Sequence, residues 1–111
     1  MGLDSYWLDG DKKKASVPGH FRLVGGMLSG HGNDSFRGKC YAGLVESVTG
    51  VSLYQELIAP EVVREMSDKL GAVRWTAQFG FDHDIEEEHF SDLVLMFRLH
   101  AEAGHSLHGW W

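Results

Sequence analysis

The spacing of the apolar residues changes along this chain between the period of a helix and the period of a strand. In three stretches the apolar residues recur every three or four positions, and in shorter stretches they alternate with polar residues. Interleaved helices and strands of this kind predict an α+β fold in which helices pack against one sheet. The chain has 111 residues, 43% of them hydrophobic, which is enough to bury a core without disulfide bonds. We therefore expect one globular domain over residues 1–111.

Three helices are predicted from the apolar stripes and from the residues that bound them, over 34–49, 60–70 and 85–103. Asn33 or Asp34 is the expected cap of the first helix, whose stripe places Cys40 on the buried face. Pro60 suits the first turn of the second helix, because a proline lacks an amide hydrogen that would have no helical partner there. The third helix is the longest, and the glutamates at its start favour the positive end of the helix dipole.

Short β-favouring stretches predict strands over 5–8, 20–24, 73–79 and 105–111, while residues 51–57 are ambiguous. The strand 73–79, the third helix and the strand 105–111 fit a right-handed crossover between parallel strands. Trp110 and Trp111 are expected to be buried, because two large aromatic side chains are poorly accommodated in water. The predicted architecture is a mixed sheet of about four to five short strands with about three helices packed on it.

Cys40 is the only cysteine, so it cannot form a disulfide within the chain. A secreted domain of this size usually carries an even set of cysteines, and a reducing compartment is therefore expected. The first residues show neither the basic nor the apolar segment of a signal peptide, and no apolar run is long enough to cross a bilayer. We expect a soluble, cytoplasmic protein with no membrane partner.

The chain carries 10 basic and 16 acidic residues, which gives a formal net charge of −6. Proteins that bind nucleic acid usually show the opposite balance, because much of their affinity comes from the counterions that lysine and arginine release. The one basic run, 12–14, lies beside aspartates in an expected loop. The composition therefore argues against a nucleic-acid partner and favours a basic protein partner.

A glycine-rich stretch, 25–34, joins an expected strand to the start of an expected helix. Such an arrangement can bind an anion through backbone amides, and His31 and Arg37 are the side chains best placed for that site. The stretch lacks the Gly-Lys-Ser/Thr of a phosphate-binding loop, and Asp34 would compete with a phosphate for the same amides. A capping loop is the simpler interpretation.

Acidic residues and histidines gather at the predicted start of the third helix, and the binding candidates among them are Asp82, His83, Asp84, Glu86 and His89. Glu86 and His89 are three residues apart and would share a helix face, which is the Glu-x-x-His spacing of carboxylate-bridged di-metal proteins. A second copy, from Glu102 to His105, is interrupted by Gly104, and such sites draw ligands from four helices. We therefore assign a binding cluster without a metal ion or other cofactor; a solvated helix start is the simpler alternative.

No catalytic residue is assigned from the sequence. Cys40 is expected to be buried and unreactive, and no serine lies in the Gly-x-Ser-x-Gly pattern of a hydrolase. The leading hypothesis is a small, acidic, non-catalytic protein-binding domain of the inhibitor or immunity type, with self-association into a homodimer left open. The alternative is a small metal- or ligand-binding enzyme that uses the cluster at 82–89 or the glycine-rich loop at 25–34. Convergence of His31, His83 and His89 on one concave surface would favour that alternative.

Overall fold

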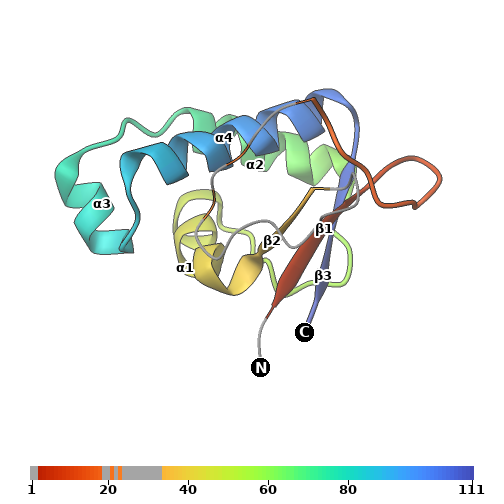
Figure 1. The fold of residues 1–111 in the computed structure, drawn as a ribbon, viewed down its shortest axis with the longest axis horizontal. Coiled ribbons are helices and arrows are strands. Elements are labelled where there is room, and N and C mark those ends of the chain that lie inside the picture. The colour runs from red at the N-terminus through yellow and green to blue at the C-terminus, as the bar shows by residue number, and fades with distance from the viewer. Residues whose placement is uncertain (1–2, 19–20, 22, 24–33) are drawn as a thin grey trace.

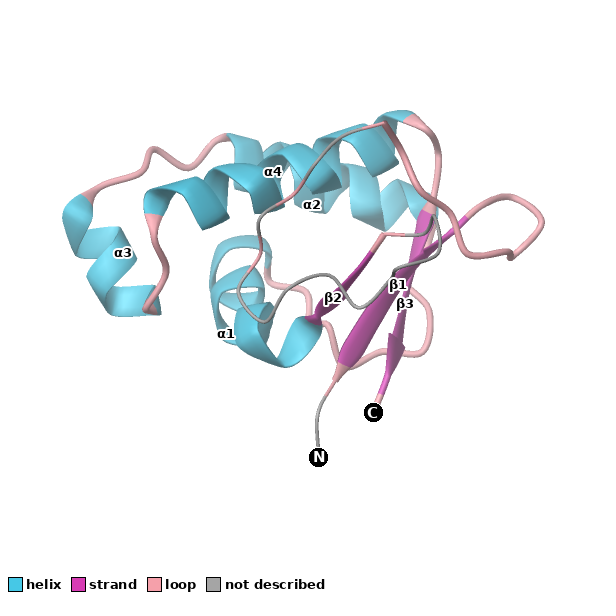
Figure 2. Cartoon of the chain, viewed as in Figure 1, coloured by secondary structure: helices cyan, strands magenta, loops and turns pink. Residues whose placement is uncertain are grey.

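The computed structural model describes residues 3–18, 21, 23 and 34–111. These residues form an α+β fold with a three-stranded antiparallel sheet and four helices (Figures 1 and 2). The strands are β1 (Asp4–Leu8), β2 (Ser35–Arg37) and β3 (Ser106–Trp110), in the order β2-β1-β3. The helices are α1 (Gly38–Thr49), α2 (Pro60–Gly71), α3 (Ala77–His83) and α4 (Glu87–Glu102). None of the helices in this described part of the chain combines the length and the apolar character that a membrane crossing requires.

The core lies between the sheet and the helices that cover one of its faces. α2 and α4 pack side by side, and α2 also contacts β3 (Figure 1). α1 follows β2 directly and contacts both β1 and α2, while α3 lies at the end of the molecule that is far from the sheet. The predicted α+β class is confirmed. The sheet formed by the described residues is antiparallel throughout, not mixed, and has fewer strands than expected.

The second and third predicted helices are confirmed as α2 and α4, whereas the first begins later than predicted. Residues Ser35–Arg37 form β2, which pairs with β1, so the helix starts only at Gly38. Phe36 falls within the helix predicted over 34–49 but is instead a buried strand residue. The buried face of α1 contains Tyr41, Leu44 and Val45 rather than Cys40. The expected burial of Cys40 is therefore wrong, and its side chain is exposed.

The predicted strand over 73–79 is wrong, because α3 begins at Ala77 and the residues before it form no strand. Thr76 caps α3, and its hydroxyl accepts a hydrogen bond from the backbone N–H of Phe79 at 3.0 Å. Phe79 also packs edge-on against Phe90 of α4, with 5.0 Å between ring centroids. The cap and this packing favour a helix, although apolar and polar residues alternate here as they do in a strand. Because residues 73–79 form no strand, the expected parallel crossover does not exist, and β3 pairs with β1 antiparallel.

Two other stretches were left ambiguous by the sequence or lie mostly outside the described residues. Of the strand predicted over 20–24, only Phe21 and Leu23 are described; both are buried and neither lies in a strand. The ambiguous stretch 51–57 is irregular and, together with Ile58, runs along the outer edge of β3. The backbone N–H of Ile58 donates to Leu107 O at 2.7 Å, and the N–H of Gly109 donates to Gln55 O at 3.0 Å. These bonds cover an edge that would otherwise present unpaired backbone groups.

The terminal strand is confirmed as β3, but the expected burial of its two tryptophans is wrong. Trp110 is 64% exposed and Trp111 is 50% exposed. In the register of the sheet Trp110 lies opposite Asp4, on the face away from the core, whereas Leu107 and Gly109 are buried. Successive side chains of a strand point to opposite faces of the sheet, and Gly109 occupies the crowded inner position. The side chain of its neighbour Trp110 therefore points away from the core.

Replacing Gly109 with alanine is expected to lower the free energy of unfolding by about 1–3 kcal/mol. An added Cβ would lie 2.6 Å from the backbone oxygen of Gln55 and 2.7 Å from that of Leu53, so the segment beside β3 would have to shift. Urea denaturation followed by tryptophan fluorescence measures the change. Gly43→Ala in α1 is the matched control, because nothing lies within 4 Å of its added Cβ and alanine favours a helix. Equal effects of the two substitutions would contradict this interpretation.

Candidate functional site

The residues predicted as a binding cluster lie where α3 ends and α4 begins. Asp82 and His83 belong to the end of α3, and Asp84 follows with a φ of 50°. Asp82 accepts a hydrogen bond from the side-chain amide of Gln78 at 2.8 Å. The ring of His83 packs against that of Phe79, with 4.6 Å between centroids. Asp82 and His83 therefore make their observed contacts within α3 itself.

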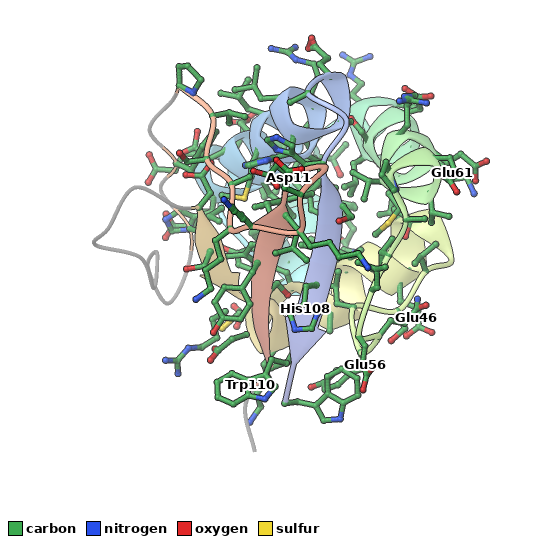
Figure 3. The ribbon with its side chains drawn as sticks, turned by 90° about the vertical axis from the view of Figure 1, so that its right-hand side faces the viewer. Asp11, Glu46, Glu56, Glu61, His108 and Trp110 are labelled. Carbon is green, nitrogen blue, oxygen red and sulfur yellow. The ribbon has the colours of Figure 1, made fainter. Side chains whose placement is uncertain are left out.

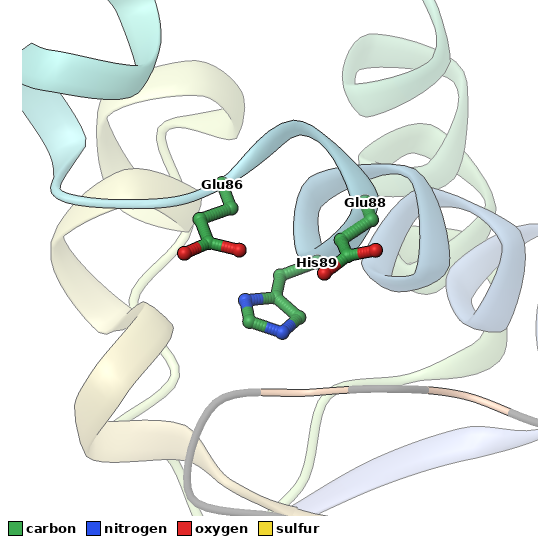
Figure 4. Close-up of side chains that lie close together, drawn as sticks. All are labelled: Glu86, Glu88 and His89. Atoms are coloured by element: carbon green, nitrogen blue, oxygen red, sulfur yellow. The ribbon is translucent and has the colours of Figure 1, made fainter.

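Glu86, Glu88 and His89 come together at the start of α4 (Figure 4). One potential ligand atom of each residue lies within 4.8 Å of the others. Glu86 holds the N-cap position of α4, but its side chain accepts no hydrogen bond from the helix amides. The Nδ1 atom of His89 is buried and has no hydrogen-bond partner in the described part of the chain. The sequence spacing indicates the pairing of Glu86 with His89, whereas it does not indicate the contribution of Glu88.

Two open pockets lie beside this junction. One has a volume of about 440 Å³ and is lined by Gly80, Asp84, Ile85, Glu86 and His89. The other has a volume of about 190 Å³ and is lined by Cys40, Tyr41, Leu44, His83, Asp84 and Ile85. His83 and His89 therefore line different pockets, which share the wall formed by Asp84 and Ile85.

The anion site predicted around the glycine-rich loop is described only in part. Arg37 is exposed, ends β2 and lies opposite Asp4 in the sheet register. His31 lies outside the described residues, as does most of the loop. The anion site therefore stays a prediction.

A second candidate surface, which sequence reasoning did not find, is formed by exposed hydrophobic side chains beside β3. The described residues include five large hydrophobic side chains that are exposed, and four of them lie on two neighbouring segments: Tyr54, Leu57, Trp110 and Trp111. We call these four residues the aromatic patch. The rings of Tyr54 and Trp111 meet edge-on with 5.6 Å between centroids. The backbone hydrogen bonds between residues 55–58 and β3 hold the two segments together.

Two carboxylates neighbour patch residues, one in the sequence and one in the sheet register. Glu56 lies within the patch segment and is exposed, and Asp4 lies opposite Trp110 in the sheet. In Figure 3 Glu56 lies toward the same end of the view as Trp110, whereas Glu61 lies toward the opposite end. The surface thus combines exposed aromatic rings with negative charge.

A chain of three polar side chains, Asp34, His100 and His105, runs through the fold. Nε2 of His100 lies 2.7 Å from Oδ2 of Asp34, and Nδ1 of His100 lies 2.8 Å from Nδ1 of His105. His100 is fully buried, and the ring of Trp7 stacks on it with 4.3 Å between centroids and 4° between planes. Burial lowers the pKa of His100 to about 4, although the hydrogen bond with Asp34 acts in the opposite direction.

These distances constrain where the protons lie. When His100 is neutral, its Nε2–H donates to Asp34, so its Nδ1 accepts and Nδ1–H of His105 donates. Oδ2 of Asp34 also accepts a hydrogen bond from the backbone N–H of Val17 at 3.1 Å. The chain of side chains therefore joins the end of α4 to residues that precede β2 and to the segment at Val17.

No family model, no curated protein and no solved structure matches this chain. The function of the protein is therefore inferred from its sequence and its geometry.

Proposed function

We propose that the protein is a non-catalytic docking domain that binds a basic protein partner through the aromatic patch. The observation that carries this proposal is the concentration of exposed hydrophobic side chains: four of the five in the described residues lie on the paired segments 54–57 and 110–111. Exposed apolar side chains scattered singly are normal on a protein surface, whereas a contiguous group rimmed by polar residues is typical of an interaction site.

The residue types of the patch suit an interface. Tryptophan and tyrosine are enriched among the few residues that carry most of the binding energy of protein interfaces. The patch residues lie on segments that are hydrogen-bonded to one another, and the rings of Tyr54 and Trp111 already touch. Such preorganisation lowers the entropy that binding costs.

The charge of the protein supports a basic partner. The net charge is −6; Glu56 lies between Tyr54 and Leu57 in the sequence, and Asp4 lies opposite Trp110 in the sheet. Negative charge around an aromatic centre accelerates encounter with a positively charged surface and disfavours acidic proteins. We therefore expect the partner surface to combine lysine or arginine with apolar side chains.

Selection of a phage-displayed library of random peptides against the purified protein tests the proposal. The enriched peptides are expected to carry lysine or arginine beside apolar residues. Their binding should weaken by at least about tenfold in Trp110→Ala and in Trp111→Ala, because both substitutions remove exposed ring surface. Added salt should also weaken binding, since it screens exposed charges. Fluorescence anisotropy of the labelled peptides measures both effects.

Phe81→Ala is the matched control, because Phe81 is an aromatic residue on α3, outside the patch, and is 83% exposed. This variant should bind the selected peptides as tightly as the original protein. Failure to enrich any peptide, enrichment of neutral or acidic peptides, or full binding by both tryptophan variants would each refute the proposal.

A further inference from the structure

We infer that Glu86, Glu88 and His89 bind one divalent transition-metal ion, and we commit to Zn²⁺ as the ion to test. One nitrogen and two carboxylate oxygens, drawn from these three residues, already lie within 4.8 Å of one another. An imidazole with two carboxylates is a donor set that zinc accepts, and three protein ligands with one open position are typical of its reactive sites. This inference does not depend on the aromatic patch.

The state of His89 points to a ligand that the described residues do not supply. Its Nδ1 atom is buried and has no hydrogen-bond partner in the described part of the chain, and the ring is directed toward the carboxylate of Glu86 (Figure 4). Buried polar atoms are nearly always paired, and an unpaired one calls for an explanation such as an ion. A cation between His89 and Glu86 would satisfy this nitrogen.

The state of Glu86 argues against the simpler interpretation, in which the acidic residues only stabilise the start of α4. Glu86 occupies the N-cap, where a side-chain oxygen commonly accepts a hydrogen bond from a helix amide. Its carboxylate accepts no such bond. The side chain is therefore available for another role, and it lies beside His89.

Metal binding requires only side-chain movement. Zinc lies about 2.0–2.2 Å from nitrogen and oxygen ligands, which places two tetrahedral ligands about 3.4 Å apart. The three ligand atoms, now within 4.8 Å, would approach one another by rotation of the glutamates, both of which are exposed. His89 is held by α4 and would act as the fixed ligand.

The position of the site leaves the ion accessible. Glu86 and His89 also line the open pocket of about 440 Å³, together with Asp84. A fourth coordination position directed into this pocket would take a water molecule or a small anionic or carbonyl-containing ligand. The structure therefore favours an open metal site over a closed structural one.

Isothermal titration calorimetry with ZnCl₂, on protein purified without a metal-affinity tag, tests the inference. The original protein is expected to bind one Zn²⁺ ion at this site, and Glu86→Gln, Glu88→Gln and His89→Asn should each weaken that binding by at least about tenfold. A Zn²⁺-dependent rise in the melting temperature, measured by differential scanning fluorimetry, should be reduced in the same three variants. The two glutamates are exposed, so their variants are expected to fold normally.

His83→Asn and Cys40→Ser are the matched controls, because both residues carry common zinc ligands and line the neighbouring pocket. Both control variants should bind Zn²⁺ as the original protein does. The inference is overturned if the original protein binds no Zn²⁺ at millimolar concentration, if binding survives in Glu86→Gln and His89→Asn, or if it is lost in the controls instead.

Discussion

Replacing Trp7 with alanine is expected to lower the free energy of unfolding by about 3–5 kcal/mol, the largest effect of any single substitution considered for this protein. Trp7 is fully buried on the central strand, where it meets Phe97 edge-on at 5.0 Å and stacks on His100 at 4.3 Å. It also contacts Phe36 of β2. Truncation would remove this burial and leave a cavity between the sheet and α4. The midpoint and slope of urea denaturation, followed by circular dichroism, measure the loss.

Trp7→Phe separates the effect of ring packing from that of the indole nitrogen. Nε1 of Trp7 is buried without a hydrogen-bond partner in the described residues, so the indole N–H contributes a desolvation cost. Phenylalanine keeps much of the ring surface and removes that cost. We therefore expect Trp7→Phe to destabilise the protein by less than half as much as Trp7→Ala. A loss of under about 1 kcal/mol in Trp7→Ala would show that the core tolerates collapse at this position.

The elements that sequence reasoning predicted correctly are those whose signals are local. In α2, Pro60 stands in the first turn and the stripe of Val63, Met66 and Leu70 is buried. α4 shows an equally regular stripe over 16 residues. Periodicity over several turns averages out single exceptions, so both helices could be predicted without tertiary contacts.

The errors occurred where a distant partner decides the local structure. Phe36 fits a helical stripe as well as a strand, and its pairing with Ser5 of β1, far away in the sequence, decides for the strand. Residues 73–79 alternate as a strand does, but seven residues are too few to outweigh the Thr76 cap and the contact of Phe79 with Phe90. The same reasoning explains why the predicted burial of Cys40 is wrong, because its orientation depends on where α1 begins.

The candidate sites also differ in whether local sequence spacing predicts them or only the tertiary fold creates them. The proximity of Glu86 and His89 follows from i,i+3 spacing and could be predicted. The aromatic patch joins Tyr54 to Trp111, and its formation depends on the outward orientation that the register with Asp4 gives Trp110. No local sequence pattern predicts that pairing of Trp110 with Asp4. The contact between Asp34 and His100 spans 66 residues and is likewise a product of the tertiary fold.

Lowering the pH from 7 to 4 is expected to reduce the free energy of unfolding by roughly 3 kcal/mol through His100 alone. The pKa of His100 is about 4 in the folded protein, below the ordinary value of 6.5, because the ring is buried. Above pH 6.5 the ring is neutral in both states. Between pH 6.5 and 4 the unfolded chain binds a proton that the folded protein does not bind, so stability falls as the pH falls. Below about pH 4 both states are protonated and this contribution stops changing.

Burial is the main reason that the folded protein resists this proton, and the neighbouring His105 adds to the effect. A proton on Nδ1 of His100 would face Nδ1 of His105, 2.8 Å away, so the bond between the two rings would be kept only if His105 moved its own proton to Nε2. Asp34 lies on the opposite side of the ring and favours the charged form, but this attraction does not offset the burial. The pKa of Asp9 is also lowered, chiefly by the hydrogen bond from Lys13 N–H. The stability that this carboxylate contributes is present above its ordinary value of 3.8 and is lost only as the pH falls below that value, outside most of the window of His100.

His100→Gln tests the assignment, because a glutamine amide can still donate toward Asp34 but does not titrate. Urea denaturation at half-unit steps between pH 7 and 4 measures the free energy of unfolding of both proteins. Between pH 6.5 and 4 this free energy should fall steeply in the original protein and stay nearly constant in the variant. The comparison uses the slope with pH, since the variant also loses the stacking of Trp7 on the imidazole and has a lower stability throughout. Equal slopes in the two proteins would assign the acid sensitivity to other groups. A flatter slope in the variant would assign this part of the acid sensitivity to protonation of the buried His100.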